Sequence, residues 1–225
     1  GAAKPTARVA EMKAANSAPP IEPPRSQEPA DDDEPLVPVD DGEITLIEDV
    51  DVVGIVDKLS PEVKQAVKGH LDWLRTGGQE GERASLQGCD LHGAELSRIN
   101  LSSVNLREAD LSEAVCTGIN LQGADLRQAN LSHANISDGN LGVAKMRHST
   151  LKNTRLDGAN MRGADLAGAN FEGASLQEAD FTGANLLSTD FLGTDLSRSK
   201  GLSQGQFNKA KADGTTRLPG GLRLP

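Results

Sequence analysis

Large apolar residues recur at every fifth position from Leu86 to Leu196. Neither the 3.6-residue period of an α-helix nor the two-residue period of a β-strand places such residues on one side of the backbone. Twenty-three of these centres are in phase, and none is polar or charged. The residue two places before each centre is small or β-branched, and it is Ala in fourteen cases. The residue just before the centre is Asn or Asp sixteen times, and Gly stands two places after it ten times.

This repeat, A-(D/N)-L-x-x, resembles the pentapeptide-repeat family over about half of the chain, residues 84–200. The resemblance implies that each pentad forms one side of a square coil, with about 20 residues per turn. The residues agree, because one small and one large side chain per pentad fill a narrow interior, and Gly supplies the positive φ of many corner turns. Stacking at roughly 4.8 Å would give nearly six coils, roughly 28 Å in all. The predicted fold class is all-β, a quadrilateral parallel β-helix with short α-helical caps at both ends.

Composition divides the rest of the chain. Eight of the eleven prolines lie in the first 38 residues, and residues 1–42 hold too few large apolar side chains to form a core. We therefore expect a disordered, acidic, Pro-rich tail there. Residues 43–59 form an apolar and acidic segment, residues 60–83 an N-terminal helical cap, and residues 201–225 a C-terminal helical cap and tail. Caps are expected because an open β-helix exposes sheet edges at its ends.

The N-terminal cap is predicted as a helix over residues 60–76. Ser60 suits the N-cap, Pro61 the first helical position, and the glycines at 77–78 the end of the helix. Its apolar face consists of Val63, Val67, Leu71 and Leu74.

The C-terminal cap is predicted as a second helix that begins with a capping box of Ser203 and Gln206 and runs to about Lys211. Leu187 and Leu192 occupy outward positions in the last coil. We expect this cap to cover them. The alternative is that they belong to a homodimer contact through the C-terminal end.

The segment at residues 43–59 leaves two interpretations open. It is rich in Ile and Val yet also acidic. It could form a short strand and a helical turn packed on the column, or it could be a partner-binding motif that uses Ile44, Leu46 and Ile47.

The net charge of −10 is concentrated in the N-terminal region. Residues 1–60 carry −9, whereas residues 84–200 carry only −4. Cys89 and Cys116 both fall at inward positions, where they are expected to be small core residues with free thiols. A reducing, cytoplasmic location fits them, and no stretch of the sequence reads as a transmembrane span or a signal peptide.

No catalytic motif is present: there is no GxSxG, no Gly-rich phosphate loop, no HExxH and no CxxC. The four histidines are expected to be solvated surface residues, and His92 and His133 have no third ligand nearby. A column filled by Ala and Leu offers no cleft for a substrate. We therefore expect no enzyme activity, no catalytic residues, no cofactor and no metal.

Outward residues 20 apart should stack into vertical columns on the four sides. One side carries Arg107, Arg127 and Arg147 in consecutive coils. This column is either a solvated strip neutralised by neighbouring acids or a basic stripe for an acidic partner, including the chain's own tail. The neighbouring side is acidic, with Asp90, Asp110, Glu113, Glu172 and Asp190 against Lys152. An Asn run from Asn100 to Asn160 is placed opposite the arginines, where it could hydrogen-bond between coils.

These features favour a non-catalytic protein-binding or scaffold module that makes no direct contact with nucleic acid. We expect residues 30–57 to carry a protein-binding determinant, since a flexible segment can wrap around a partner. The resemblance also implies an alternative, because quinolone-resistance members bind DNA gyrase as mimics of duplex DNA. A mimic should carry its acids on the column itself.

Overall fold

The computed structural model divides the chain into two units, Gly1–Gly42 and Glu43–Pro225, and describes residues 59–225. The predictions for the tail and for the segment preceding Leu59 therefore lie outside the described residues. No helix among residues 59–225 is long and apolar enough to cross a membrane.

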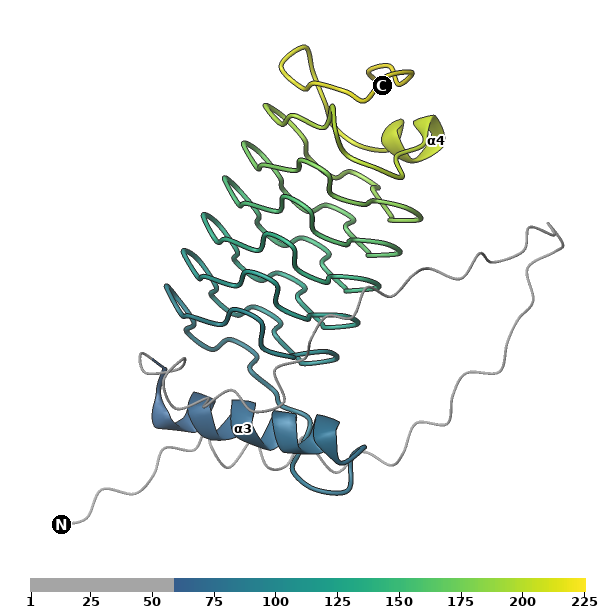
Figure 1. Cartoon of the computed structure of the whole chain (residues 1–225). Coiled ribbons are helices and arrows are strands. Elements are labelled where there is room, and N and C mark those ends of the chain that lie inside the picture. The colour runs from purple at the N-terminus through teal and green to yellow at the C-terminus, as the bar shows by residue number, and fades with distance from the viewer. Residues whose placement is uncertain (1–58) are drawn as a thin grey trace, which may run out of the picture. The chain divides into compact units, whose positions relative to one another are not determined.

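Parallel bridges between residues 20 apart define the column. They run from Ser85↔Asn105 to Asp180↔Lys200, and each joins the residue just before one centre to its equivalent in the next coil. Four pentads therefore complete one turn, and the turns stack as Figure 1 shows. We call the four sides A to D in chain order. They are centred on Leu86, Leu91, Leu96 and Leu101 and on every twentieth residue thereafter.

The interior is filled as the period predicts. All 23 centres are buried, and so is every residue two places before a centre except Cys89, which is only partly buried. Near the C-terminal end, Phe171 stacks on Phe191, which in turn stacks on Phe207. Inward hydroxyl groups are compatible with the core because they donate hydrogen bonds to backbone carbonyls. Thr154, for example, donates to Leu131 C=O at 2.8 Å. The burial is consistent with a single hydrophobic stack along the whole column.

Hydrogen bonds explain the choice of Asn or Asp before each centre. The centre's N–H bonds to the next coil, as Leu126 does to Lys145 C=O at 2.7 Å. The residue after the centre has no such partner, and the side chain before the centre accepts its N–H instead: Asp125 Oδ1 lies 3.3 Å from Arg127 N. This local side-chain cap recurs around the column and satisfies a donor that the ladder cannot reach.

The corner residue two places after each centre has positive φ in every pentad from Gly88 to Gly193. Glycine was predicted to serve these turns, and it does so at ten of them. Twelve others carry non-glycine residues in the same left-handed conformation, including the β-branched Val143 at φ 50°. The backbone geometry is thus set by the repeat, whichever residue occupies the corner.

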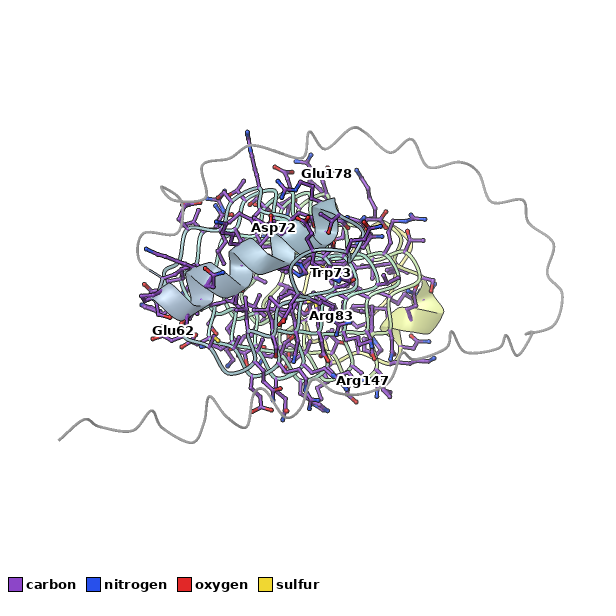
Figure 2. All side chains as sticks on the ribbon, turned by 90° about the horizontal axis from the view of Figure 1, so that it is seen from below. Glu62, Asp72, Trp73, Arg83, Arg147 and Glu178 are labelled. Atoms are coloured by element: carbon purple, nitrogen blue, oxygen red, sulfur yellow. The ribbon has the colours of Figure 1, made fainter. Side chains whose placement is uncertain are left out.

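Helix α3 (Pro61–Arg75) lies at the N-terminal end of the column. Ser60 accepts the N–H of Val63, and Pro61 occupies the first turn, as the sequence predicts. Val63 and Val67 join the hydrophobic core, whereas the predicted face residues Leu71 and Leu74 are only partly buried. His70 contributes to the buried face instead. Figure 2 shows the helix crossing the end of the coils.

Helix α4 (Gln204–Phe207) is shorter than predicted. The capping box of Ser203 and Gln206 is present, but the helix ends at Phe207 rather than near Lys211. Residues after it return to the ladder, with bridges Asp190↔Lys211 and Asp195↔Arg217. Pairing with the last coil requires extended backbone, which ends the helix early.

The C-terminal segment does not cover both outward leucines. Leu187 remains 54% exposed, so the prediction that the cap buries it is wrong, while Leu192 is partly buried. Strand-like pairing of residues 209–217 seals the backbone edge of the last coil but leaves the outer end of side A open.

Candidate interaction surface

The three arginines of side A occupy the same position in consecutive coils, directly after a buried centre. This position points outward, because its neighbours on both sides are turned into the core or the ladder. Figure 2 places Arg147 at one edge of the column and Glu178 of side C at the opposite edge. The fold therefore brings Arg107, Arg127 and Arg147 into one vertical column.

Two of these arginines are neutralised within the column. Arg127 binds Asp125 in bidentate fashion, with Nε and a terminal nitrogen at 2.7 and 2.5 Å from its carboxylate oxygens. Hydrogen bonding from Arg127 lowers the pKa of Asp125, and the pair raises the pKa of Arg127 in return. Arg147 forms an ion pair with Asp165 in the next coil. Side A is therefore a strip of alternating charge at these coils.

Arg107 differs from the other two. It forms no ion pair within residues 59–225, and its Nε is buried without a hydrogen-bond partner there. It lies close enough to Asp125 to help lower the pKa of that carboxyl group. Among residues 59–225, Arg107 is thus the one arginine of this column that has no acidic partner.

Side B adjoins side A and carries the acidic candidates. Asp110 accepts hydrogen bonds from Ser112 and from Asn130, and the bonds from Ser112 are the main reason that its pKa is lowered. Glu113 lies 3.9 Å from the ring of His92. Asp90 caps the N–H of His92 at 3.0 Å. These carboxylates form an acidic face beside the arginine column.

Asparagines do form rungs along the axis, though on a different side from the one predicted. Asn120 donates to Asn100 at 3.0 Å, and Asn160 donates to Asn140 at 3.1 Å. They lie on side D, which adjoins side A, because consecutive pentads occupy consecutive sides. Placing them opposite the arginines was wrong. Sequence reasoning also missed their second role, which is to cap the N–H two residues on.

The histidines do not form a site. No group of three or more potential metal ligands occurs among residues 59–225. His70 was expected at the surface but is fully buried, where Nδ1 accepts the N–H of Ala84 at 3.2 Å and the ring stacks on Trp73. Burial lowers its pKa. The only signal for this in the sequence was its place three residues after Val67 and seven after Val63, on the apolar face of the helix.

The remaining candidates fall elsewhere. Ile44, Leu46 and Ile47 lie outside the described residues. Cys116 is buried, and burial raises its pKa to about 12, so its thiol is not a reactive group. The described part of the chain thus presents charged faces around a filled core.

Comparison with known proteins identifies the repeat. The family model for pentapeptide repeats matches eight copies that together span residues 82–200. No curated protein sequence matches the chain.

Several solved structures are similar to the chain. HetL, involved in heterocyst differentiation regulation in Nostoc sp. strain PCC 7120, is 28% identical over 61% of this chain and 78% of its own, with a TM-score of 0.35. A pentapeptide repeat protein from the Arabidopsis thaliana thylakoid lumen is 31% identical over 45% of this chain and 68% of its own, also at 0.35. QnrB1, a plasmid-mediated fluoroquinolone resistance protein, is 18% identical over 62% and 88%, with a TM-score of 0.40.

Proposed function

The chain belongs to the pentapeptide-repeat family, and from that premise we propose that it is a non-catalytic protein-binding module. The observation that carries the proposal is the filled interior, in which all 23 centres are buried. A substrate has no cavity to enter along the column, whereas the outward positions repeat at fixed spacing on four sides. Such a surface suits recognition of another macromolecule through flat faces.

The contact surface that we propose is the corner between sides A and B. It combines the arginine column, Arg107, Arg127 and Arg147, with the acidic residues Asp90, Asp110 and Glu113. A partner with charges of both signs would meet complementary groups across this corner. Arg107 would make the first contact, because no ion pair within residues 59–225 has to break first.

Two further contacts belong to the proposal. The acidic segment at residues 30–57, with Ile44, Leu46 and Ile47, would supply a flexible second contact that gains from being tethered to the column. Leu187, exposed at the C-terminal end of side A, would support a homodimer there. We also propose that α3 and residues 201–225 act as caps that keep the column from pairing end to end.

The second candidate is a DNA mimic that binds gyrase, and side B is the observation that favours it. That side holds five carboxylates against the single ammonium of Lys152, which is itself paired with Glu172 at 2.6 Å. Duplex DNA carries one charge per roughly 1.7 Å, or about 16 over a column of roughly 28 Å. The column carries a net charge of only −4. The deficit makes mimicry the weaker of the two candidates.

The proposal is tested with the full chain and two matched arginine variants. Arg107→Glu reverses the unpaired cation of the candidate corner, and Arg155→Glu reverses an exposed arginine on side C. Partners are captured from lysate and identified by mass spectrometry, and binding of each identified partner is then measured with purified proteins. We expect Arg107→Glu to weaken binding and Arg155→Glu to leave it unchanged. Equal binding by both variants would exclude the corner as the contact.

A gyrase supercoiling assay separates the two candidates. Inhibition by the full chain that survives Arg107→Glu would support mimicry. Removing residues 1–57 tests the tail in the same assays. Loss of partner binding on this truncation, with the circular dichroism of the column intact, would place recognition in the tail.

A further inference from the structure

Among residues 59–225, the N-terminal edge of the first coil is incompletely paired. In every later coil, the residue before the centre directs its N–H and C=O toward the preceding coil, as Asp110 does to Cys89 and Leu91. The residue after the centre directs its C=O the same way, as Ser112 does to Gly93. In the first coil these groups face outward from the end of the column.

On sides B and C, none of these groups has a partner within residues 59–225. They are the N–H and C=O of Asp90 and Glu95 and the C=O of His92 and Ser97. The corresponding groups of Ser85 and Asn100, on sides A and D, have no partner there either, but α3 already lies against side A, where His70 Nδ1 accepts the N–H of Ala84 at 3.2 Å. A row of unpaired backbone groups on two adjacent sides is an open sheet edge, ready to accept an extended strand.

Side-chain packing at this edge is incomplete as well. Cys89, on side B, is the one residue two places before a centre that is not buried. Its counterparts in later coils of side B are buried, because the preceding coil covers them. A residue stacked one coil above Cys89 would complete the core at this corner.

The sequence before α3 contains two pentads that fit this edge. Residues 45–54 read TLIED-VDVVG, with apolar centres at Ile47 and Val52. Thr45 and Val50 stand two places before these centres, the position that holds small or β-branched residues throughout the column. The corner positions fall on Asp49 and Gly54, and both residue types tolerate positive φ.

We propose that residues 45–54 add two further sides to the β-helix, docking on the open edge of sides B and C. In this register, the N–H groups of Ile47 and Val52 meet the C=O groups of Asp90 and Glu95. The N–H groups of Asp49 and Gly54 meet the C=O groups of His92 and Ser97. The N–H groups of Asp90 and Glu95 donate to Thr45 and Val50. Every unpaired group of sides B and C at this edge then has a partner, and Thr45 covers Cys89.

The connection to α3 is long enough. Leu59 is 7% exposed and belongs to the same core cluster as Val63, so the chain is already anchored at this end of the column where α3 begins. The four residues 55–58 can span roughly 13–14 Å, against a side of about 10 Å set by packing across a sheet interior. Because the segment is tethered next to its site, its effective concentration there is high.

Charge does not prevent this docking. Asp51 would stack on Glu95, but the column already contains such a pair, since Asp90 bridges Asp110 on side B. The proposal assigns Ile47 and Val52 to the column and leaves the acidic residues before Glu43 to a partner. Docking would bury Ile47, so it replaces the contact with a partner proposed above for that residue. The rest of the proposed function is unaffected, and the test of the docking requires no partner.

The reactivity of Cys89 tests the docking in the full chain. Val52→Asp places a charge at a centre, whereas its neighbour Val53→Asp places the same charge at an outward position. We expect Val52→Asp to raise the rate of Cys89 modification by a maleimide by at least about tenfold, as local opening exposes the thiol. Val53→Asp should leave the rate unchanged. Mass spectrometry distinguishes Cys89 from the buried Cys116, and circular dichroism checks that both variants retain the column.

A crosslink tests the register. Stacked residues in neighbouring coils lie about 4.8 Å apart, within the Cα separation that a disulfide requires. Thr45→Cys should therefore form a disulfide with Cys89 on mild oxidation with copper phenanthroline, and Val50→Cys, which would stack on Ala94, should not.

Three results would overturn the docking. One is equal modification rates in Val52→Asp, Val53→Asp and the parent chain. Another is crosslinking of both cysteine variants or of neither. The third is protection of Cys89 that depends on protein concentration, because a second copy would then cover the edge.

Discussion

Substitutions at two glycines near the C-terminal end of the column can measure the free-energy cost of the corner conformation without a contribution from steric crowding. Gly193 is a corner residue at φ 68°, and Gly205 lies inside α4. A Cβ added at either position would meet nothing within 4 Å. The two sites therefore differ in backbone conformation and not in available space. Replacing each by Ala isolates that difference within one region of the column.

The two substitutions should have opposite signs. At Gly193, Ala would pay about 1–2 kcal/mol for a left-handed conformation, offset by about 0.4–1 kcal/mol from the less flexible unfolded chain. The expected loss is up to about 1.6 kcal/mol. At Gly205, Ala should gain up to about 1 kcal/mol from its higher helix propensity. The difference between the variants is then up to about 2.6 kcal/mol.

Thermal unfolding followed by far-ultraviolet circular dichroism measures this difference. For a unit of this size, 1 kcal/mol shifts Tm by about 2–4 °C. Gly193→Ala should melt below the parent and Gly205→Ala at or above it. A Gly193→Ala protein as stable as Gly205→Ala would show that the corners do not enforce positive φ, and would refute the account of the repeat given above.

Three further predictions follow from the same structure. Leu131→Asp should unfold the column, because an uncompensated charge in the core costs several kcal/mol, while Ser132→Asp at the next outward position should not change Tm measurably. Stability of the α3 end, followed by Trp73 fluorescence, should fall as the pH drops below about 6.5, since burial lowers the pKa of His70 and the unfolded chain takes up the proton first. His70→Asn, which keeps an acceptor for Ala84 N–H, should remove this pH dependence. A pH profile that the substitution leaves unchanged would contradict the assignment. Deleting residues 203–225 should promote association seen by light scattering, because it frees backbone donors of the last coil; a truncated chain that stays monomeric with the parent's Tm would argue against the capping role.

The fold was predictable because one short period fixes nearly everything about the column. Once Leu126 is a centre, its phase decides which residues are buried, which lie at the corner and which partner each has 20 residues away. The ends were less predictable because they obey no period. Whether residues after Phe207 continue a helix or return to the ladder depends on tertiary pairing with Asp190, which local propensity does not report.

The candidate surface was predictable only in part, for a related reason. The phase places Arg107, Arg127 and Arg147 in one column, but it does not say which carboxylates they meet. Arg127 pairs within its own pentad and Arg147 with the next coil, a choice made by side-chain conformation. His70 was wrongly predicted to lie at the surface. The sequence does not show its hydrogen-bond partner, the N–H of Ala84, which allows this polar residue to be buried.

The structural role of each pentad position explains the acidic residues of side B better than it explains the arginines of side A. The centre and the residue two before it fill the core, the residue before the centre caps a backbone N–H, and the corner residue must adopt positive φ. Only the residue directly after the centre has no side-chain role that recurs from pentad to pentad. Asp90 and Asp110 of side B both act as such caps, so the fold accounts for an acidic group there without any partner.

The repeat gives no such explanation for the arginine column, although Arg127 and Arg147 pair with Asp125 and Asp165. All three arginines occupy the position that the fold leaves free, in three consecutive coils of one side, and the backbone would be equally satisfied by the Ser112 or Ser132 found there on side B. Arg107 even buries its Nε without a partner among the described residues, which costs stability rather than adding to it. A feature that the structure does not require and that carries a local cost is better explained by binding than by folding. The corner at Arg107 is therefore where a partner should first be sought, ahead of the acidic face.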